Sequence, residues 1–151
     1  MDRANREIES RSKRHLIDSF WELINEELTN ECKKKFQEGH YADAVETSFK
    51  LIEMKVKKLL KDKGVDTARY DGAVPLMHDA FSVKNPLIQL VSKTDDFYNN
   101  IQQGYMEIYA GAFSAIRNQK AHEIVEITQE RAINFIFLAN LLFERLEERV
   151  K

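Results

Sequence analysis

The chain has 151 residues, 43% of them apolar and 32% charged, a balance that excludes a disordered protein and predicts one soluble domain over residues 1–151. The formal net charge of −2 excludes a protein that attracts polyanions over its whole surface. With a single cysteine, Cys32, neither an intramolecular disulfide nor a cysteine-built zinc site can form, so we expect a reducing, cytoplasmic setting.

The first part of the chain has the apolar spacing of amphipathic helices. Apolar residues recur every three or four positions between Arg6 and Phe36 without a glycine or proline, which predicts one long helix ended by Gly39. The same spacing predicts a second helix from Tyr41 to Lys63, with Gly64 as its left-handed cap. Lysines gather in this second helix, where they form either a local nucleic-acid surface or an ordinary solvated helix face.

The middle of the chain is divided into short pieces. Residues 65–74 are polar and contain glycine, so we expect a loop, and Pro75 opens a short helix that runs through Ser82. The pair Asn85-Pro86 starts another short piece, and the polar residues 92–100 indicate turns.

Two further long helices complete an all-α prediction, a helical bundle of about four long helices plus short ones. Ile101–Ile116 has an apolar face, residues 118–128 are polar and weakly periodic, and Gln129–Glu148 is helical again. The run Ala132–Phe143 is apolar on more than one face, yet it is too short for a membrane span, which needs about 20 residues. We therefore expect a second subunit to cover this run, and no contact with a membrane.

Most kinds of catalytic site find no support in the sequence. The four histidines form no HExxH motif or other close pair, which argues against a catalytic metal, and without a glycine-rich phosphate loop we expect no cofactor. Cys32 lies on the apolar face of a helix and is expected to be a small buried hydrophobic residue. The histidines are His15, His40, His78 and His122.

The remaining candidate site is the run from Arg117 to His122, where the third long helix ends. On an unbroken helix five residues rotate the chain by roughly 500°, so the two side chains would point about 140° apart. Either the helix breaks at Asn118 and His122 folds back, or both residues meet partners from another subunit. A structural role is the alternative, because an arginine in a last helical turn complements the helix dipole and a loop histidine can hydrogen-bond a carbonyl.

Several short segments accompany this run in a fixed order: Phe36–Val45, Phe49-Lys50, Asp71-Gly72, Leu76-Met77, Ala80–Ser82, Gly104–Met106, Ala110–Ala112, Ile116–Asn118 and Ala121–Glu123. The pair Arg117-Asn118 followed by His122 resembles the signature of the HEPN superfamily (higher eukaryotes and prokaryotes nucleotide-binding domains). The accompanying segments are similar to a Ymh-like prokaryotic family of conserved hypothetical proteins within that superfamily. The resemblance covers about residues 35–148 and leaves residues 1–34 as an extra N-terminal helix.

This resemblance implies a metal-independent endoribonuclease of a prokaryotic defence or toxin–antitoxin system, for instance in abortive infection. It implies RNA as substrate, a homodimer whose two motifs share one cleft, and an antitoxin or other regulatory protein as a further partner. His122 then transfers protons and Arg117 contacts the phosphate, with no metal. Asn118, Lys120 and Glu123 are supporting or RNA-binding candidates.

Two other functions predict different behaviour. A non-catalytic dimerising interaction or sensor domain of a defence system predicts that Arg117 and His122 are held in structural hydrogen bonds and that RNA stays intact. An antitoxin-like regulator predicts an exposed hydrophobic patch on the last helix.

Overall fold

The computed structural model describes residues 2–93, 95–117 and 126–151, and most of these residues are helical, with no strand among them. The all-α prediction is confirmed. Among the described residues, no helix is long and apolar enough to cross a membrane. The six α-helices of these ranges are α1 (Arg3–Ser19), α2 (Glu26–Gln37), α3 (Tyr41–Asp62), α4 (Ala73–Ala80), α5 (Asp96–Ala112) and α6 (Gln129–Glu147). Three short turns accompany them: the 3₁₀ turns η1 (Phe20–Leu23) and η2 (Thr67–Arg69), and the π-helical turn η3 (Phe113–Arg117).

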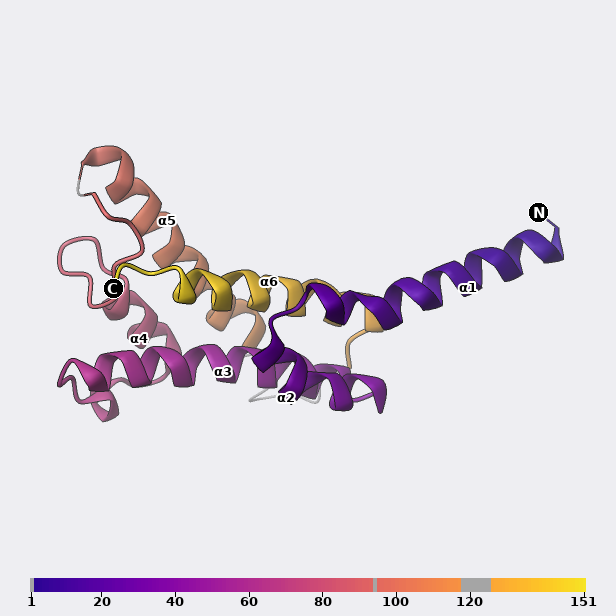
Figure 1. Ribbon diagram of the computed structural model, residues 1–151. Coiled ribbons are helices and arrows are strands. Elements are labelled where there is room, and N and C mark those ends of the chain that lie inside the picture. Colours follow the sequence, from indigo (N-terminus) through magenta and orange to yellow (C-terminus); the bar gives the residue numbers. More distant parts are fainter. Residues whose placement is uncertain (1, 94, 118–125) are drawn as a thin grey trace.

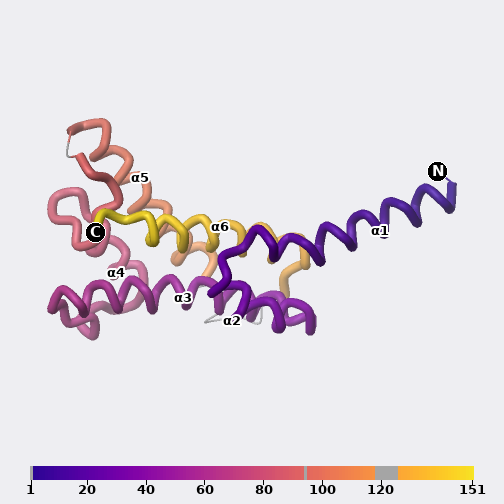
Figure 2. Tube along the Cα trace, in the orientation of Figure 1, coloured from indigo at the N-terminus to yellow at the C-terminus, as the bar shows by residue number. Residues whose placement is uncertain are grey.

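The helices α2 to α6 form one body, and α1 extends away from it (Figure 1). In the ribbon, α3 and α6 lie side by side, α2 folds back along the beginning of α3, and α4 and α5 close the far end. The trace in Figure 2 shows the same arrangement, with the N-terminus at the tip of α1. No residue of α1 is buried, and α1 meets this body only near its C-terminal end, where Ile17 packs partly buried against the core and Lys13 pairs with Glu130 of α6.

The predicted continuous helix from Arg6 to Phe36 is wrong, because the chain turns between α1 and α2. Asn25 caps α2 by accepting a hydrogen bond from the Glu27 amide at 3.0 Å. The Asn25 amide in turn donates to the Asn140 Oδ1 atom of α6 at 2.8 Å. In a continuous helix the Asn25 amide would donate to the carbonyl four residues earlier. It bonds instead to Asn140, 115 positions away in the chain, and this distant contact stabilises the break between α1 and α2.

The prediction of a helix from Tyr41 to Lys63 is confirmed, because α3 begins at Tyr41 and ends at Asp62, one residue before the predicted end. Gly64 has φ +79°, and the amides of Gly64 and Val65 donate to the Lys61 and Leu60 carbonyls at 2.9 and 3.0 Å. These two bonds form a Schellman ending, and the positive φ explains the glycine. The predicted helix at Gln129–Glu148 is likewise confirmed as α6.

The region before α5 differs from the prediction. The turns expected for residues 92–100 end at Asp95, whose side chain accepts from the Tyr98 amide and caps α5. No helix starts at Asn85-Pro86; residues 82–93 form an irregular segment instead. Side-chain hydrogen bonds replace the missing helical bonds, and sequence periodicity does not detect them.

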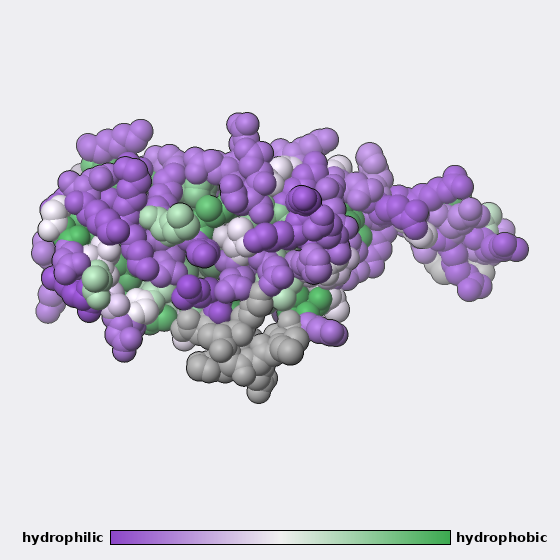
Figure 3. Space-filling model, turned by 90° about the horizontal axis from the view of Figure 1, so that it is seen from below, coloured by the Kyte–Doolittle hydropathy of each residue, from purple (hydrophilic) through white to green (hydrophobic). Residues whose placement is uncertain are grey.

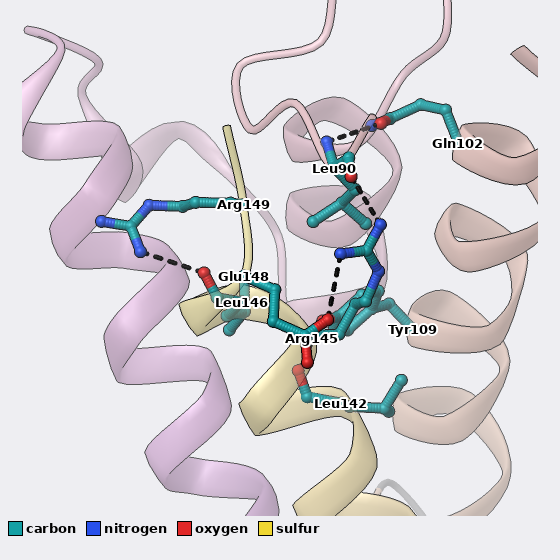
Figure 4. A network of polar contacts seen from close by, with 8 residues as sticks. All are labelled: Leu90, Gln102, Tyr109, Leu142, Arg145, Leu146, Glu148 and Arg149. Carbon is teal, nitrogen blue, oxygen red and sulfur yellow. Dashed lines mark hydrogen bonds and ion pairs between the residues drawn. The ribbon is translucent and has the colours of Figure 1, made fainter. Parts of the chain in front are cut away.

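Gln102 and Arg145 hold this irregular segment against the helices (Figure 4). The Gln102 side chain accepts from the Leu90 amide at 2.8 Å and donates to the Phe81 and Ile88 carbonyls at 3.1 and 3.0 Å. The Arg145 guanidinium donates to the Leu90 carbonyl and contacts Glu148. Both polar atoms of the Gln102 side-chain amide are thereby hydrogen-bonded to backbone groups.

The core is formed by residues from α2 to α6 together with η1 and η3. Tyr109 is fully buried, stacks on Phe81 at 4.2 Å between ring centroids and donates to the Leu142 carbonyl at 2.6 Å. Cys32 is fully buried, as predicted, and burial raises the pKa of its thiol to about 12. The other largest fully buried side chains are Phe49, Phe113, Phe143, Leu28, Ile52, Leu60, Leu76, Met77, Ile136 and Leu142.

Candidate functional site

Arg117 is the last residue of η3, the π-helical turn that directly follows α5. Single π-helical turns are rare and occur often at functional sites, because the widened turn shifts the side chains that follow it. Phe113, the first residue of the turn, is buried and meets Phe49 of α3 edge-on at 5.6 Å. The core therefore fixes the start of the turn, and Arg117 follows at its partly exposed end.

The Arg117 guanidinium faces α3, where Glu53 lies. Its Nη2 atom is 3.1 Å from the Glu53 Oε2 atom. The other carboxylate oxygen of Glu53, Oε1, lies 2.8 Å from the Lys57 Nζ atom one helical turn further along α3. One carboxylate thus joins two cations from different helices, and we call these three residues the Glu53 triad.

The burial of the triad is uneven. The Glu53 side chain is 9% exposed, whereas Arg117 and Lys57 are 29% and 40% exposed. Arg117 approaches Oε2 without the alignment of a hydrogen bond, so the contact is an ion pair. A buried carboxylate needs such partners, since its desolvation costs several kcal/mol when it is unpaired. The two cations keep part of their surface in water, where an anion can reach them.

Four of the predicted site residues lie outside the described residues: His122, Asn118, Lys120 and Glu123. Whether His122 folds back toward Arg117 or meets a second subunit stays a prediction. The described part of the site is therefore the Glu53 triad, which includes Arg117, and the rest is known from the sequence alone.

Glu53 and Lys57 are site residues that the sequence analysis missed. Glu53 lies on the same side of α3 as buried Phe49, Ile52 and Val56, and a carboxylate among such residues needs a cationic partner. Lys57, four residues later, is in the right position to be one partner. This signal was present in the sequence, but the second partner is 64 positions away and periodicity does not reveal it.

The other histidines considered as ligands are exposed and lie on, or directly before, three different helices. His15 belongs to α1, His40 precedes α3 and His78 belongs to α4. Within residues 2–93, 95–117 and 126–151, no three His, Cys, Asp or Glu side chains are grouped so that they could hold a metal ion.

A family model matches most of the chain. The family described as "Protein of unknown function (Hypoth_ymh)" matches residues 22–146. The chain belongs to the Hypoth_ymh family. Neither a curated protein nor a solved structure matches the chain.

The limits of the Hypoth_ymh match divide the chain as the fold does. The match begins at residue 22, within η1, so it omits α1 and includes α2. This start is earlier than the predicted limit near residue 35, and residues 22–34 belong to the matched region. The triad and the run from Arg117 to His122 all lie inside it.

Proposed function

We propose that this Hypoth_ymh protein is a HEPN-type, metal-independent endoribonuclease of a prokaryotic defence or toxin–antitoxin system. The observation that carries the proposal is the position of Arg117. Its guanidinium is partly exposed, it is held at the end of a π-helical turn by a buried carboxylate, and His122 follows it five positions later in the sequence. A fixed arginine and a histidine close to it in the sequence are the residue types that phosphodiester cleavage needs.

The reaction uses a nucleophile that RNA itself carries. His122 takes the proton of the ribose 2′-hydroxyl, the 2′-oxygen attacks the adjacent phosphorus, and the bond to the 5′-oxygen breaks. His122 of the partner subunit gives a proton to the departing 5′-oxygen, so the products are a 2′,3′-cyclic phosphate and a 5′-hydroxyl end. Arg117 stabilises the negative charge that develops on the phosphate oxygens. Asn118, Lys120 and Glu123 support the loop or contact RNA.

The proposal includes a homodimer, because one chain offers a single His122 and two proton transfers are needed. An apolar groove between α1 and α6 supports this part of the proposal. Leu16 of α1, Leu23 of η1 and Phe137 of α6 are 66%, 71% and 36% exposed. Contiguous apolar surface of this kind is typical of an interaction site. Its lining residues include Leu16, Ile17, Phe20, Leu23, Ile133 and Phe137.

The second candidate is a non-catalytic interaction or sensor domain, with an antitoxin or other regulator as its partner. The ion pair between Arg117 and Glu53 favours it, since a structural arginine is expected to have such a partner. The two functions differ in whether the purified chain cleaves RNA.

Cleavage of a mixture of total RNA and tRNA in EDTA tests the proposal. We expect the wild-type protein to cut RNA and leave 2′,3′-cyclic phosphate ends, and we expect Arg117→Ala and His122→Ala each to reduce the rate by at least about 100-fold. His78→Ala, at an exposed position on α4, is the matched control and retains the wild-type rate. Intact RNA after incubation with a folded wild-type dimer would favour the interaction domain.

A further inference from the structure

The lysines of α3 differ in the side of the helix that they occupy and in what they contact. Lys55 turns toward α6, where its Nζ atom lies 4.3 Å from the centre of the Phe143 ring and pairs with Glu147. Lys58 pairs with Asp62 on its own helix at 3.0 Å. The remaining lysines are Lys50, Lys57 and Lys61.

These three lysines share one side of α3. At about 100° per residue, their directions fall within roughly 40° of one another, and they are spread over about 16 Å of helix length at 1.5 Å per residue. Lys50 and Lys61 are exposed, and neither forms an ion pair with another residue of the described ranges. Figure 3 views the molecule from below, along the side where α2 and α3 run in Figure 1, and this surface is mostly hydrophilic.

The line of lysines meets Arg117 at its centre. Lys57 and Arg117 both contact Glu53, so the guanidinium lies beside the lysine line rather than on a separate surface. Apart from Glu53, the acids on this side of α3 are Asp43 and Glu46, which precede Lys50. From Lys50 to Lys61, this side presents four cations with Arg117 included, and the one carboxylate among them, Glu53, is buried.

We infer that Lys50, Lys57 and Lys61 form, together with Arg117, a phosphate-binding face on α3 that holds the backbone of single-stranded RNA. The inference rests on the proposed function, which it extends from the reacting phosphate to the neighbouring ones. Ammonium groups on flexible side chains contact phosphates without reading the bases. The face therefore binds the strand and sets its direction across Arg117, and it gives no base preference.

Binding of a strand that cannot be cleaved tests this inference without requiring catalysis. The probe is a fluorescein-labelled 20-nucleotide RNA with 2′-O-methyl groups, and its anisotropy is measured between 50 and 200 mM salt. We expect the double variant Lys50→Ala/Lys61→Ala to bind roughly 10- to 30-fold more weakly at 100 mM salt. The slope of log affinity against log salt should fall by about 1.4, or about 0.7 for each lost phosphate contact.

The double variant Lys34→Ala/Lys58→Ala is the matched control. It removes the same charge from exposed lysines that pair with Glu38 and Asp62 outside the proposed face. We expect it to change affinity less than threefold, with both variants melting at the wild-type temperature. Equal losses in the two variants, or no binding by the wild type, would overturn the inference. Competition by polyglutamate as strong as by unlabelled RNA would also overturn it, because the face would then prefer acidic protein.

The readouts separate this inference from the proposed function. If wild-type protein binds the probe through Lys50 and Lys61 but leaves RNA intact, the face stands and the nuclease proposal fails. If RNA is cleaved with an unchanged KM in Lys50→Ala/Lys61→Ala, the nuclease proposal stands and the face is wrong.

Discussion

Replacement of Arg117 by alanine changes stability as well as chemistry, because it removes one partner of a buried carboxylate. The Glu53 Oε2 atom, 3.1 Å from the guanidinium, is left without its cation, while Lys57 still holds Oε1. Removal of one member of a fully buried pair costs about 3–5 kcal/mol. Here Arg117 is 29% exposed and Lys57 remains, so water and the lysine offset much of that cost. We expect Arg117→Ala to lower the free energy of unfolding by about 1–2 kcal/mol.

Urea unfolding of four proteins measures this effect: wild type, Arg117→Ala, Glu53→Gln and the double variant. An amide at position 53 leaves no buried charge, so Glu53→Gln should reduce the cost of the Arg117→Ala change. We expect a coupling free energy of about 1 kcal/mol from the double-mutant cycle. For a chain of this length, 1 kcal/mol corresponds to a melting shift of about 2–4 °C.

A coupling below about 0.3 kcal/mol would refute the reasoning, since it lies within the deviation expected for independent sites. In that case the stability of buried Glu53 does not depend on Arg117, and their ion pair adds nothing measurable to the free energy of unfolding. The unfolding measurements also show whether a loss of cleavage by Arg117→Ala reflects unfolding of the variant or a missing catalytic group. If the variant remains folded at the assay temperature, the loss belongs to the chemistry.

Two further predictions concern the buried thiol and the apolar groove. Burial raises the pKa of the Cys32 thiol from 9.0 to about 12, so the thiol ionises at a lower pH in the unfolded chain than in the folded one. The stability that the neutral buried thiol contributes is therefore complete below pH 9 and is lost as the pH rises toward 12. Between pH 9.5 and 11, stability measured in urea should therefore fall less steeply in Cys32→Ala, by up to about 1.4 kcal/mol per pH unit, and parallel slopes would contradict this. Phe137→Glu in the groove should convert the proposed dimer to a monomer in sedimentation velocity at micromolar concentration, whereas Phe97→Glu, an equally apolar exposed change on α5, should not. An unchanged sedimentation coefficient in Phe137→Glu would place the interface elsewhere.

Local chemistry predicts the helices of this chain well, and distant contacts explain the errors. The boundaries of α3 and α6 followed from apolar spacing and from Gly64, whose positive φ is a local requirement. The break before α2 did not, because the Asn25 amide bonds to Asn140 on the other side of the fold. Contacts that join residues so far apart in the chain leave no periodic trace.

The candidate site shows the same division. Arg117 was identified from the motif that it begins, and the structure adds its place at the end of a π-helical turn. Glu53 and Lys57 were missed, although a carboxylate on the buried side of a helix was visible in the sequence. What sequence could not supply was the identity of the cation that covers it, since only the packing of η3 against α3 brings Arg117 there.

The side-chain bonds around residues 82–93 have a consequence for the dynamics of this non-helical segment. The Leu90 amide donates to a Gln102 side chain that is itself 2% exposed, and the Val150 amide donates to the Gln89 carbonyl at 2.9 Å. Release of the Leu90 proton to solvent therefore requires α5 to move. In hydrogen exchange, this irregular segment belongs to the same cooperative unit as the helices, and its slowest amide reports on the opening of the whole far end of the bundle.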